Sequence, residues 1–311
     1  MNPAWSMIFF TTLAGAGQGL MLALFGVDLA GRLGLIDIAP RALFVAGAVL
    51  VLVLCGVGLV ASTFHLGHVG RAWRAASQWR TSWLSREVIV LPALMAVVAA
   101  WGLAHWSGAP TIAWGAAAAV LALALYLCTG MIYAAIAVIR EWATPLTPLN
   151  FALIGTASGL TVAAALAAST APALASPLAG LALLATALAA VVRGAAFWRN
   201  ATLAPKTTLQ TAIGVRHPRI VQATQGAMGG SFNTREFFHG AAAAVLPRLR
   251  WLVALLAFAA PVALLALGRG EASLALLVAA ALLQYAGLLA ERWLFFAEGR
   301  HPQNLYYQRV G

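Results

Sequence analysis

The sequence predicts an all-α fold, a polytopic membrane bundle of about eight transmembrane helices. Of its 311 residues, 62% are hydrophobic and only 9% are charged, whereas soluble domains average about 25% charged residues. The mean hydropathy is +0.89. A soluble core of this length could not hide so much apolar surface, so the remaining apolar surface must face lipid.

Eight apolar runs are long enough to cross a bilayer. A hydrocarbon core about 30 Å thick needs roughly 20 apolar residues for each helical crossing. Their Gly and Ala content suits close helix packing in lipid, and the segment 116–125 lacks the alternation of a β-barrel strand. The first run has no basic segment before it, so we interpret it as a helix and not as a cleaved signal. The runs span 6–27, 42–64, 88–106, 112–139, 150–170, 178–198, 251–267 and 273–295.

The distribution of basic residues predicts the orientation. With eight crossings, both termini and the even-numbered loops share one side, which holds fifteen of the 19 Lys and Arg residues. Since cytoplasmic loops carry the excess of basic residues, both termini are predicted to be cytoplasmic in a bacterial inner membrane. Arg193 lies within 178–198 and is expected to snorkel towards the basic side. The fifteen are Arg71, Arg74, Arg80, Arg86, Arg140, Arg199, Lys206, Arg216, Arg219, Arg235, Arg248, Arg250, Arg292, Arg300 and Arg309, and only Arg32, Arg41 and Arg269 lie opposite.

The chain 1–311 is interpreted as a single membrane anchor domain with one long cytoplasmic loop at 199–250. A net charge of +11 could suit a nucleic-acid partner. We predict none, because the basic residues are spread over loops with no nucleic-acid-binding fold. Topology and anionic lipid account for part of this charge. A loop this long in a compact protein is commonly functional, so we predict that it docks a cytoplasmic partner. The predicted docking residues are Arg216, Arg219, Arg235, Phe237 and Phe238.

A glycine-rich turn at 225–231 stands within this loop. Asn233 and Glu236 follow it in the positions of an N-cap and the third residue of a helix. No Walker lysine follows and no strand precedes, so the turn does not predict a nucleotide site.

The Cys and His residues predict neither a metal site nor haem. Cys55 and Cys128 lie inside separate predicted helices without a CxxC or CxxCH motif. A bis-histidine haem needs two imidazoles at similar depth. His65 and His105 fall at opposite ends of neighbouring helices, and the other four His residues lie in loops or the tail.

Polar residues gather where the helix over 42–64 ends and the helix over 88–106 begins. Consecutive antiparallel helices place His65 and Glu87 at the same depth, where an ionisable group is costly unless it is paired or hydrated. Histidine can donate a hydrogen bond to a quinone carbonyl and titrates near neutral pH, and Glu87 can pass protons. The alternative is that Glu87 merely favours a helix N-terminus and His65 is an ordinary interfacial residue. The group consists of His65, His68, Arg71, Arg74, Ser85 and Glu87.

The segment 61–87, ASTFHLGHVGRAWRAASQWRTSWLSRE, resembles the corresponding segment of the dimethyl sulfoxide reductase anchor subunit family. The shared pattern is HLG, then RA, then S-x-E, and the eight-helix plan extends the resemblance to nearly the whole chain. In that family the anchor carries no haem, holds a molybdopterin catalytic subunit and an iron–sulfur subunit on the membrane, and exchanges electrons with quinone. The resemblance implies a ubiquinone or menaquinone site built from His65, Glu87, Arg71, Arg74 and Ser85 in a subunit that is not catalytic by itself.

Dimethyl sulfoxide reductase has its catalytic subunits in the periplasm, whereas the charge count places the large loop of this chain in the cytoplasm. The branch of the family that anchors cytoplasmic sulfite dehydrogenase fits this orientation, and the segment 217–240 also resembles that branch. The resemblance therefore implies electron transfer from sulfite oxidation to the quinone pool.

Three alternatives stay open. The anchor could serve a reductase that passes electrons from quinol to a sulfur, selenium or arsenic oxyanion, or it could be purely structural. A transporter should show internal repeats and broken helices with polar groups near mid-membrane. Here Gln18, Gln284 and Tyr285 are the few candidates.

Overall fold

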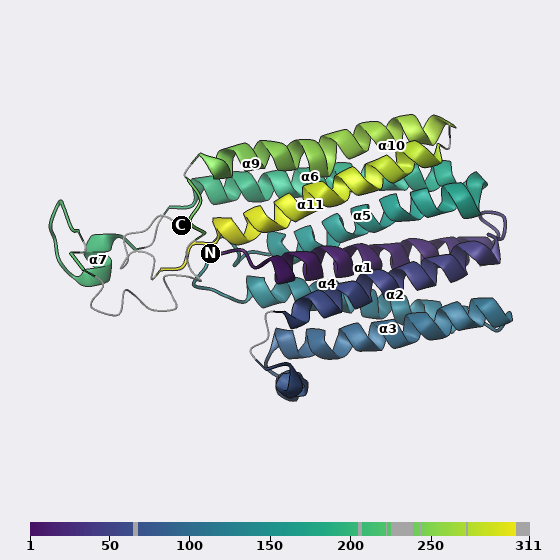
Figure 1. Ribbon diagram of the computed structural model, residues 1–311, viewed down its shortest axis with the longest axis horizontal. Coiled ribbons are helices and arrows are strands. Elements are labelled where there is room, and N and C mark those ends of the chain that lie inside the picture. The colour runs from purple at the N-terminus through teal and green to yellow at the C-terminus, as the bar shows by residue number, and fades with distance from the viewer. Residues whose placement is uncertain are drawn as a thin grey trace.

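The computed structural model describes residues 1–64, 68–204, 207–221, 223–224, 239–242, 244–271 and 273–302. The predicted all-α fold is confirmed, because eight helices in these ranges are long and apolar enough to span a membrane. The helices lie side by side in one elongated bundle (Figure 1). The spanning segments are α1 (Trp5–Arg32), α2 (Arg41–Thr63), α3 (Trp83–Ser107), α4 (Ile112–Ala134), α5 (Leu146–Thr170), α6 (Pro172–Thr202), Val245–Gly270, and α11 (Leu274–Glu298).

Shorter elements lie between the spans and within the seventh span. A 3₁₀ helix, η1 (Val69–Gln78), follows α2, and a single helical turn, α7 (Leu209–Ile213), follows α6. The seventh span consists of α9 (Val245–Val253), the π-helical stretch η2 (Ala254–Ala259) and α10 (Ala260–Glu271). A π-helical turn widens the backbone at this point, and Pro261, two residues after it, has no N–H to give to the regular helical ladder.

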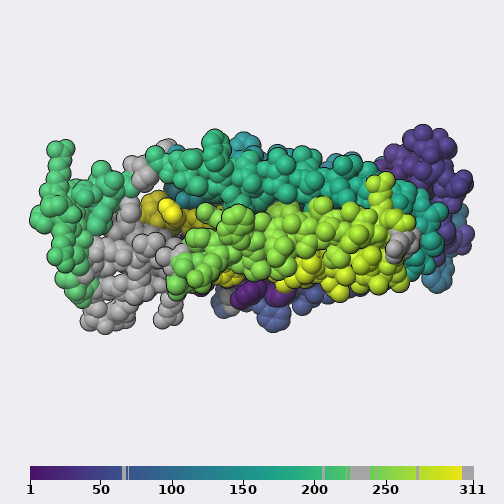
Figure 2. Space-filling model, turned by 90° about the horizontal axis from the view of Figure 1, so that it is seen from above, coloured from purple at the N-terminus to yellow at the C-terminus, as the bar shows by residue number. Residues whose placement is uncertain are grey.

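Both ends of the chain's helical part lie at the same end of the bundle. The start of α1, the end of α11, α7 and η1 are all found there, whereas the turns after α1, α3, α5 and α10 lie at the other end (Figure 1). Figure 2 shows that the segment around α7 projects beyond the body of helices. We call this end the loop end and the other the far end.

Two pairs of glycines bring α1 and α5 into backbone contact. Gly15 and Gly19 are four residues apart on α1, and they face Gly155 and Gly159 on α5. A Cβ at Gly159 would lie 2.1 Å from the carbonyl carbon of Gly19. Small residues four apart permit this approach between helices in lipid. The hydroxyl of Tyr126 on α4 donates to the Gly15 carbonyl at 2.8 Å and so ties a third helix to the crossing.

The outer surface of the bundle is apolar, as a lipid-facing surface requires. Valines one helical turn apart form a stripe along α2. These side chains, Val49, Val53, Val57 and Val60, are all more than half exposed. The large apolar side chains of this stripe therefore face lipid.

The ends of several helices differ from the predicted runs. The run 112–139 stops being helical at Ala134, because Ile139 and Trp142 turn back and are buried among other aromatic side chains. In contrast, α3 begins earlier than predicted, where Ser82 caps it, and α11 continues to Glu298. Arg292 was counted among the fifteen basic residues of the cytoplasmic side, and this was wrong because it is buried inside α11. The excess of basic residues in the loop-end segments persists without it.

Adding one methyl group at the crossing tests its tightness. A Cβ at Gly19 would lie 2.2 Å from the Gly155 carbonyl oxygen, whereas a Cβ at Gly26 on the same helix meets nothing within 4 Å. We expect Gly19→Ala to destabilise the bundle by about 1–3 kcal/mol through overpacking. Gly26→Ala should be neutral or slightly stabilising, because alanine favours helix. Unfolding in mixed detergent micelles measures both, and equal stability of the two variants would contradict the proposed packing.

Candidate functional site

The start of α3 is held in place by short-range hydrogen bonds. The Ser82 side chain accepts a bond from the Ser85 backbone N–H at 3.3 Å, which caps the helix. Arg86 donates to the carbonyls of Trp79 (2.9 Å) and Arg80 (2.8 Å). These bonds fix the turn between η1 and α3 and set the direction in which the next residue, Glu87, points.

Glu87 points into the bundle and not towards the loop. Its side chain is only 3% exposed, and its Oε1 accepts a hydrogen bond from the Thr129 hydroxyl of α4. Ser85, two residues earlier, is equally buried. A carboxyl group in this position costs free energy unless it is hydrogen-bonded, and Thr129 supplies one such bond.

Thr129 connects Glu87 to a small polar cavity between α1, α4, α5 and α11. The cavity has a volume of about 20 Å³, which is enough for about one water molecule. Among the described residues, Gln18 Oε1 and Arg292 Nη1 are buried without a hydrogen-bond partner. The polar lining comprises Thr11, Thr12, Gln18, Tyr126, Thr129, Ser158 and Arg292. Through its bond to Thr129, Glu87 therefore adjoins a cavity whose lining combines polar and apolar side chains.

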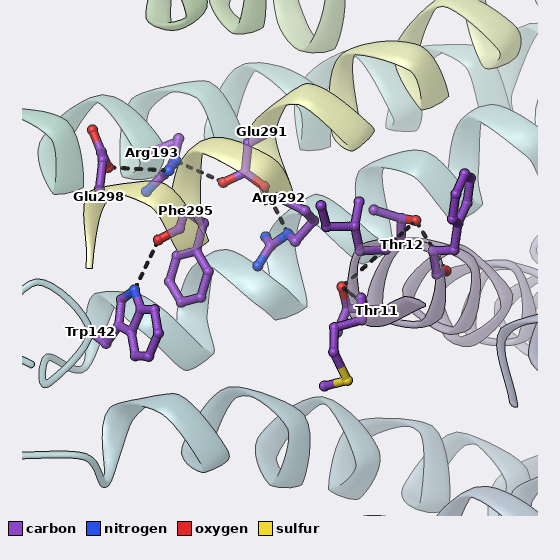
Figure 3. Close-up of polar contacts among 11 residues, drawn as sticks. Thr11, Thr12, Trp142, Arg193, Glu291, Arg292, Phe295 and Glu298 are labelled. Carbon is purple, nitrogen blue, oxygen red and sulfur yellow. Dashed lines mark hydrogen bonds and ion pairs between the residues drawn. The ribbon is translucent and has the colours of Figure 1, made fainter. Parts of the chain in front are cut away.

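A network of buried ions lies beyond this cavity. Arg193 of α6 pairs with Glu291 at 2.8 Å between Nε and Oε1, and the other oxygen of Glu291 lies 2.8 Å from Arg292 Nε. Figure 3 shows that these groups converge between α6 and α11. Glu291 is fully buried, and each arginine is 3% exposed. Both guanidinium groups also stack on aromatic rings, Arg193 on Phe197 at 4.1 Å and Arg292 on Phe151 at 3.8 Å.

The network reaches the surface at the loop end. Glu298 Oε2 lies 3.7 Å from Arg193 Nη2, and Glu298 Oε1 pairs with Arg250 Nη2 of α9 at 2.8 Å. The Arg250 side chain is 38% exposed, whereas Glu298 is buried. Ionised groups thus extend from the loop-end surface to the cavity that Thr129 lines, and they tie α6, α9 and α11 together.

The expectation that Arg193 snorkels to the boundary was wrong. A guanidinium group reaches towards water when it has no partner in the bundle, but Glu291 and Glu298 on α11 pair with it. The sequence did carry a signal for this network. Arg193 and the Glu291-Arg292 pair fall inside two predicted membrane runs, where ionisable residues indicate partners or function.

The predicted quinone-site residues are only partly brought together. Ser85 and Glu87 are both buried at the start of α3. Arg71 and Arg74 lie exposed on η1, and none of the described contacts joins them to Glu87. His65 lies outside the described residues. Its closeness to Glu87 stays a prediction.

The predicted docking residues fall in two groups. Arg216 and Arg219 are exposed on the segment that follows α7, where the Arg219 backbone N–H donates to His217 Nδ1 at 3.1 Å. Arg235, Phe237 and Phe238, and with them the predicted helix start at Asn233 and Glu236, lie outside the described residues. Their docking role stays a prediction.

The two Cys residues lie on different helices. Cys55 and Cys128 are buried, unbonded to each other, on α2 and α4. His105 lies near the end of α3 at the far end. Within the described ranges, no three His, Cys, Asp or Glu side chains gather as a metal site requires.

Comparison with known proteins identifies the class. Residues 1–298 match the family of the DMSO reductase anchor subunit (DmsC), and the chain belongs to this family of membrane anchor subunits. The chain is also 49% identical over 324 aligned positions to a subunit of the sulfite dehydrogenase of Allochromatium vinosum. That alignment covers the whole of both chains. The predicted resemblance to the anchor family is therefore confirmed.

Removing one partner from the ion network tests whether the charges stabilise the bundle. In Glu291→Gln, two buried guanidinium groups lose their shared carboxylate, which we expect to cost about 3–5 kcal/mol. Glu141→Gln, at a partly exposed position, should cost less than about 1 kcal/mol. Unfolding of the purified chain in detergent measures the difference, and a stability of Glu291→Gln equal to that of Glu141→Gln would show that the network contributes little.

Proposed function

We propose that this chain is the membrane anchor and quinone-reactive subunit of a molybdenum and iron–sulfur oxidoreductase, through which electrons from sulfite oxidation enter the quinone pool. The observation that carries the quinone part is Glu87, a buried carboxyl group at the loop-end boundary of the bundle, which is bonded to Thr129, a residue that lines a small cavity. The sulfite part is supported by the name and the full-length similarity of the A. vinosum protein.

The residues around Glu87 fit the needs of a quinone headgroup. When bound, a quinone accepts two electrons and two protons, so its site requires a hydrogen-bond donor and a proton-exchanging group. The Thr129 bond engages Oε1 of Glu87, so Oε2 is the oxygen that we assign to proton exchange. His65, by its place in the sequence at the end of α2, is the proposed hydrogen-bond donor. Ser85 is assigned to positioning the first turn of α3 beside Glu87.

Exposed arginines at the loop end suit an acidic protein partner. Arg71 and Arg74 are exposed on η1, and Arg216 and Arg219 are exposed beyond α7. We assign all four to contacts with the iron–sulfur subunit, which in turn carries the molybdopterin subunit. Complementary charge speeds and orients such docking. Because Arg71 and Arg74 are exposed and Glu87 is buried, this role suits them better than a direct contact with quinone.

The orientation with the loop end in the cytoplasm belongs to the same proposal. The loop-side segments of the sequence hold most of the basic residues, and such an excess marks the cytoplasmic side of bacterial inner-membrane proteins. Sulfite oxidation and proton uptake would then occur on the same side of the membrane.

Neutralising the proposed proton-exchanging group tests the site. Glu87→Gln keeps an oxygen that can accept the Thr129 bond but cannot ionise, so the complex should assemble normally. We expect quinone-dependent sulfite oxidation to fall at least about 100-fold, in the range of lost acid–base catalysis. Turnover with a soluble electron acceptor should be unchanged.

Glu141→Gln is the matched control, because Glu141 is a carboxylate at the same end of the bundle that accepts a long bond, 3.4 Å, from the Arg300 backbone N–H. Normal quinone-dependent turnover in Glu87→Gln would overturn the assignment of Glu87. If a quinone analogue fails to bind even the unaltered complex, the anchor is purely structural.

Because sulfite oxidation and proton uptake by quinone are proposed to occur on the same side of the membrane, we expect no charge to cross it. Complex reconstituted in liposomes and supplied with sulfite and quinone should turn over without generating a membrane potential. A potential-sensitive dye, calibrated with a potassium diffusion potential, measures this. A potential that grows with turnover and collapses with a protonophore would contradict the proposed arrangement.

A further inference from the structure

A second polar pocket lies at the far end of the bundle, away from Glu87. It has a volume of about 350 Å³, within the range of small-ligand pockets. Its walls are the end of α1, the start of α2, the end of α3 and the turn before α4. Nothing in the proposed electron-transfer function uses it. Its charged and polar lining residues are Asp28, Arg32, Arg41, His105 and Thr111.

The inner wall is built around Asp28, which is 6% exposed. Thr111 donates to its Oδ2 at 2.8 Å, and Arg32 Nε lies 3.0 Å from its Oδ1. His105 Nε2 lies 3.4 Å from Oδ2, and its ring stacks on Phe44 with 4.2 Å between centroids. These contacts hold Arg32 and His105 against residues of α1, of α2 and of the turn before α4. The polar wall of the pocket is therefore preformed.

Two guanidinium groups stand at the mouth of the pocket. The Arg32 side chain is 46% exposed, and its Nη2 donates to Thr111 at 2.6 Å. Arg41 is exposed and donates from Nη1 to the Trp106 carbonyl at 3.0 Å. Among the lining residues, two arginines face one carboxylate, that of Asp28, and the carboxylate of Asp37 next to Ile38 is exposed outside the lining. Arginine stays protonated in proteins, so the positive charge of both arginines persists at any physiological pH.

Basic residues are rare at the far end of the bundle, so the placement of these two arginines is unusual. Only three basic residues are predicted on this side, and Arg32 and Arg41 converge on one pocket. Basic residues are disfavoured on the side opposite to the basic loops, so topology does not account for the pair. The other walls are apolar, formed by Val27, Ile38, Ala39, Phe44 and Ala104.

We infer that this pocket binds the phosphate group of an anionic phospholipid. Its position where the spanning helices end places the two guanidinium groups at headgroup level, and arginine forms charge-assisted bonds with phosphate oxygens. The apolar walls suit the glycerol and first acyl carbons of such a lipid. The bound lipid would bridge α1, α2 and α3 at this end.

The test measures lipid binding to the purified full-length chain by native mass spectrometry. Phosphatidylglycerol should bind in preference to phosphatidylcholine, whose headgroup carries no net charge. Arg41→Gln should weaken phosphatidylglycerol binding at least about fivefold, as expected for one arginine at an anionic headgroup. Arg269→Gln is the matched control, because Arg269 lies near Gly180 at the same end, outside the pocket. It should leave the affinity unchanged.

A pocket-filling variant separates shape from charge. Ala109→Trp occupies the mouth of the pocket without changing its charge and should also abolish the preference for phosphatidylglycerol, while thermal unfolding confirms that the chain is folded. If Arg41→Gln and Arg269→Gln weaken phosphatidylglycerol binding equally, the binding depends on general surface charge and the inference is overturned. So would saturable binding of inorganic phosphate with no preference for the lipid.

Discussion

The backbone contact between α1 and α5 is the constraint on which the rest of the bundle depends. Gly15 and Gly19 permit this approach, and the Tyr126 hydroxyl of α4 donates to the Gly15 carbonyl beside it. The cavity lined by Gln18 and Thr129 lies beside this three-helix junction. A wider crossing would separate α1 from α4 and α5, and the polar groups around Glu87 would no longer share one enclosed interior.

Polar groups inside the bundle form separate clusters at its two ends. At the loop end, Glu87 and the Arg193–Glu291 pair are buried on different helices, with a water-sized polar cavity between them. At the far end, Asp28 organises a separate cluster. Because buried ions in a membrane are costly unless they are paired, each cluster joins helices that are distant in sequence. The charges therefore specify the packing as well as any chemistry.

The sequence predicted the eight crossings because length and hydropathy depend on each helix alone. It also located Glu87 at a helix start near the boundary, since Ser85-Arg-Glu87 is a local pattern. It did not predict Thr129 as the partner of Glu87, or Glu291 as the partner of Arg193, because these contacts depend on which helices are neighbours. The Gly and Ala content of the apolar runs indicated close helix packing, but composition does not identify which helices are neighbours.

The central claim is that quinone binds at the loop end beside Glu87. Photo-crosslinking with an azido-quinone, followed by peptide mapping of the intact complex, tests it most directly. We expect labelling of the first turns of α3 and of α4 near Thr129, with competition by unlabelled quinone. Competed labelling confined to the far end, around Asp28 and His105, would contradict it.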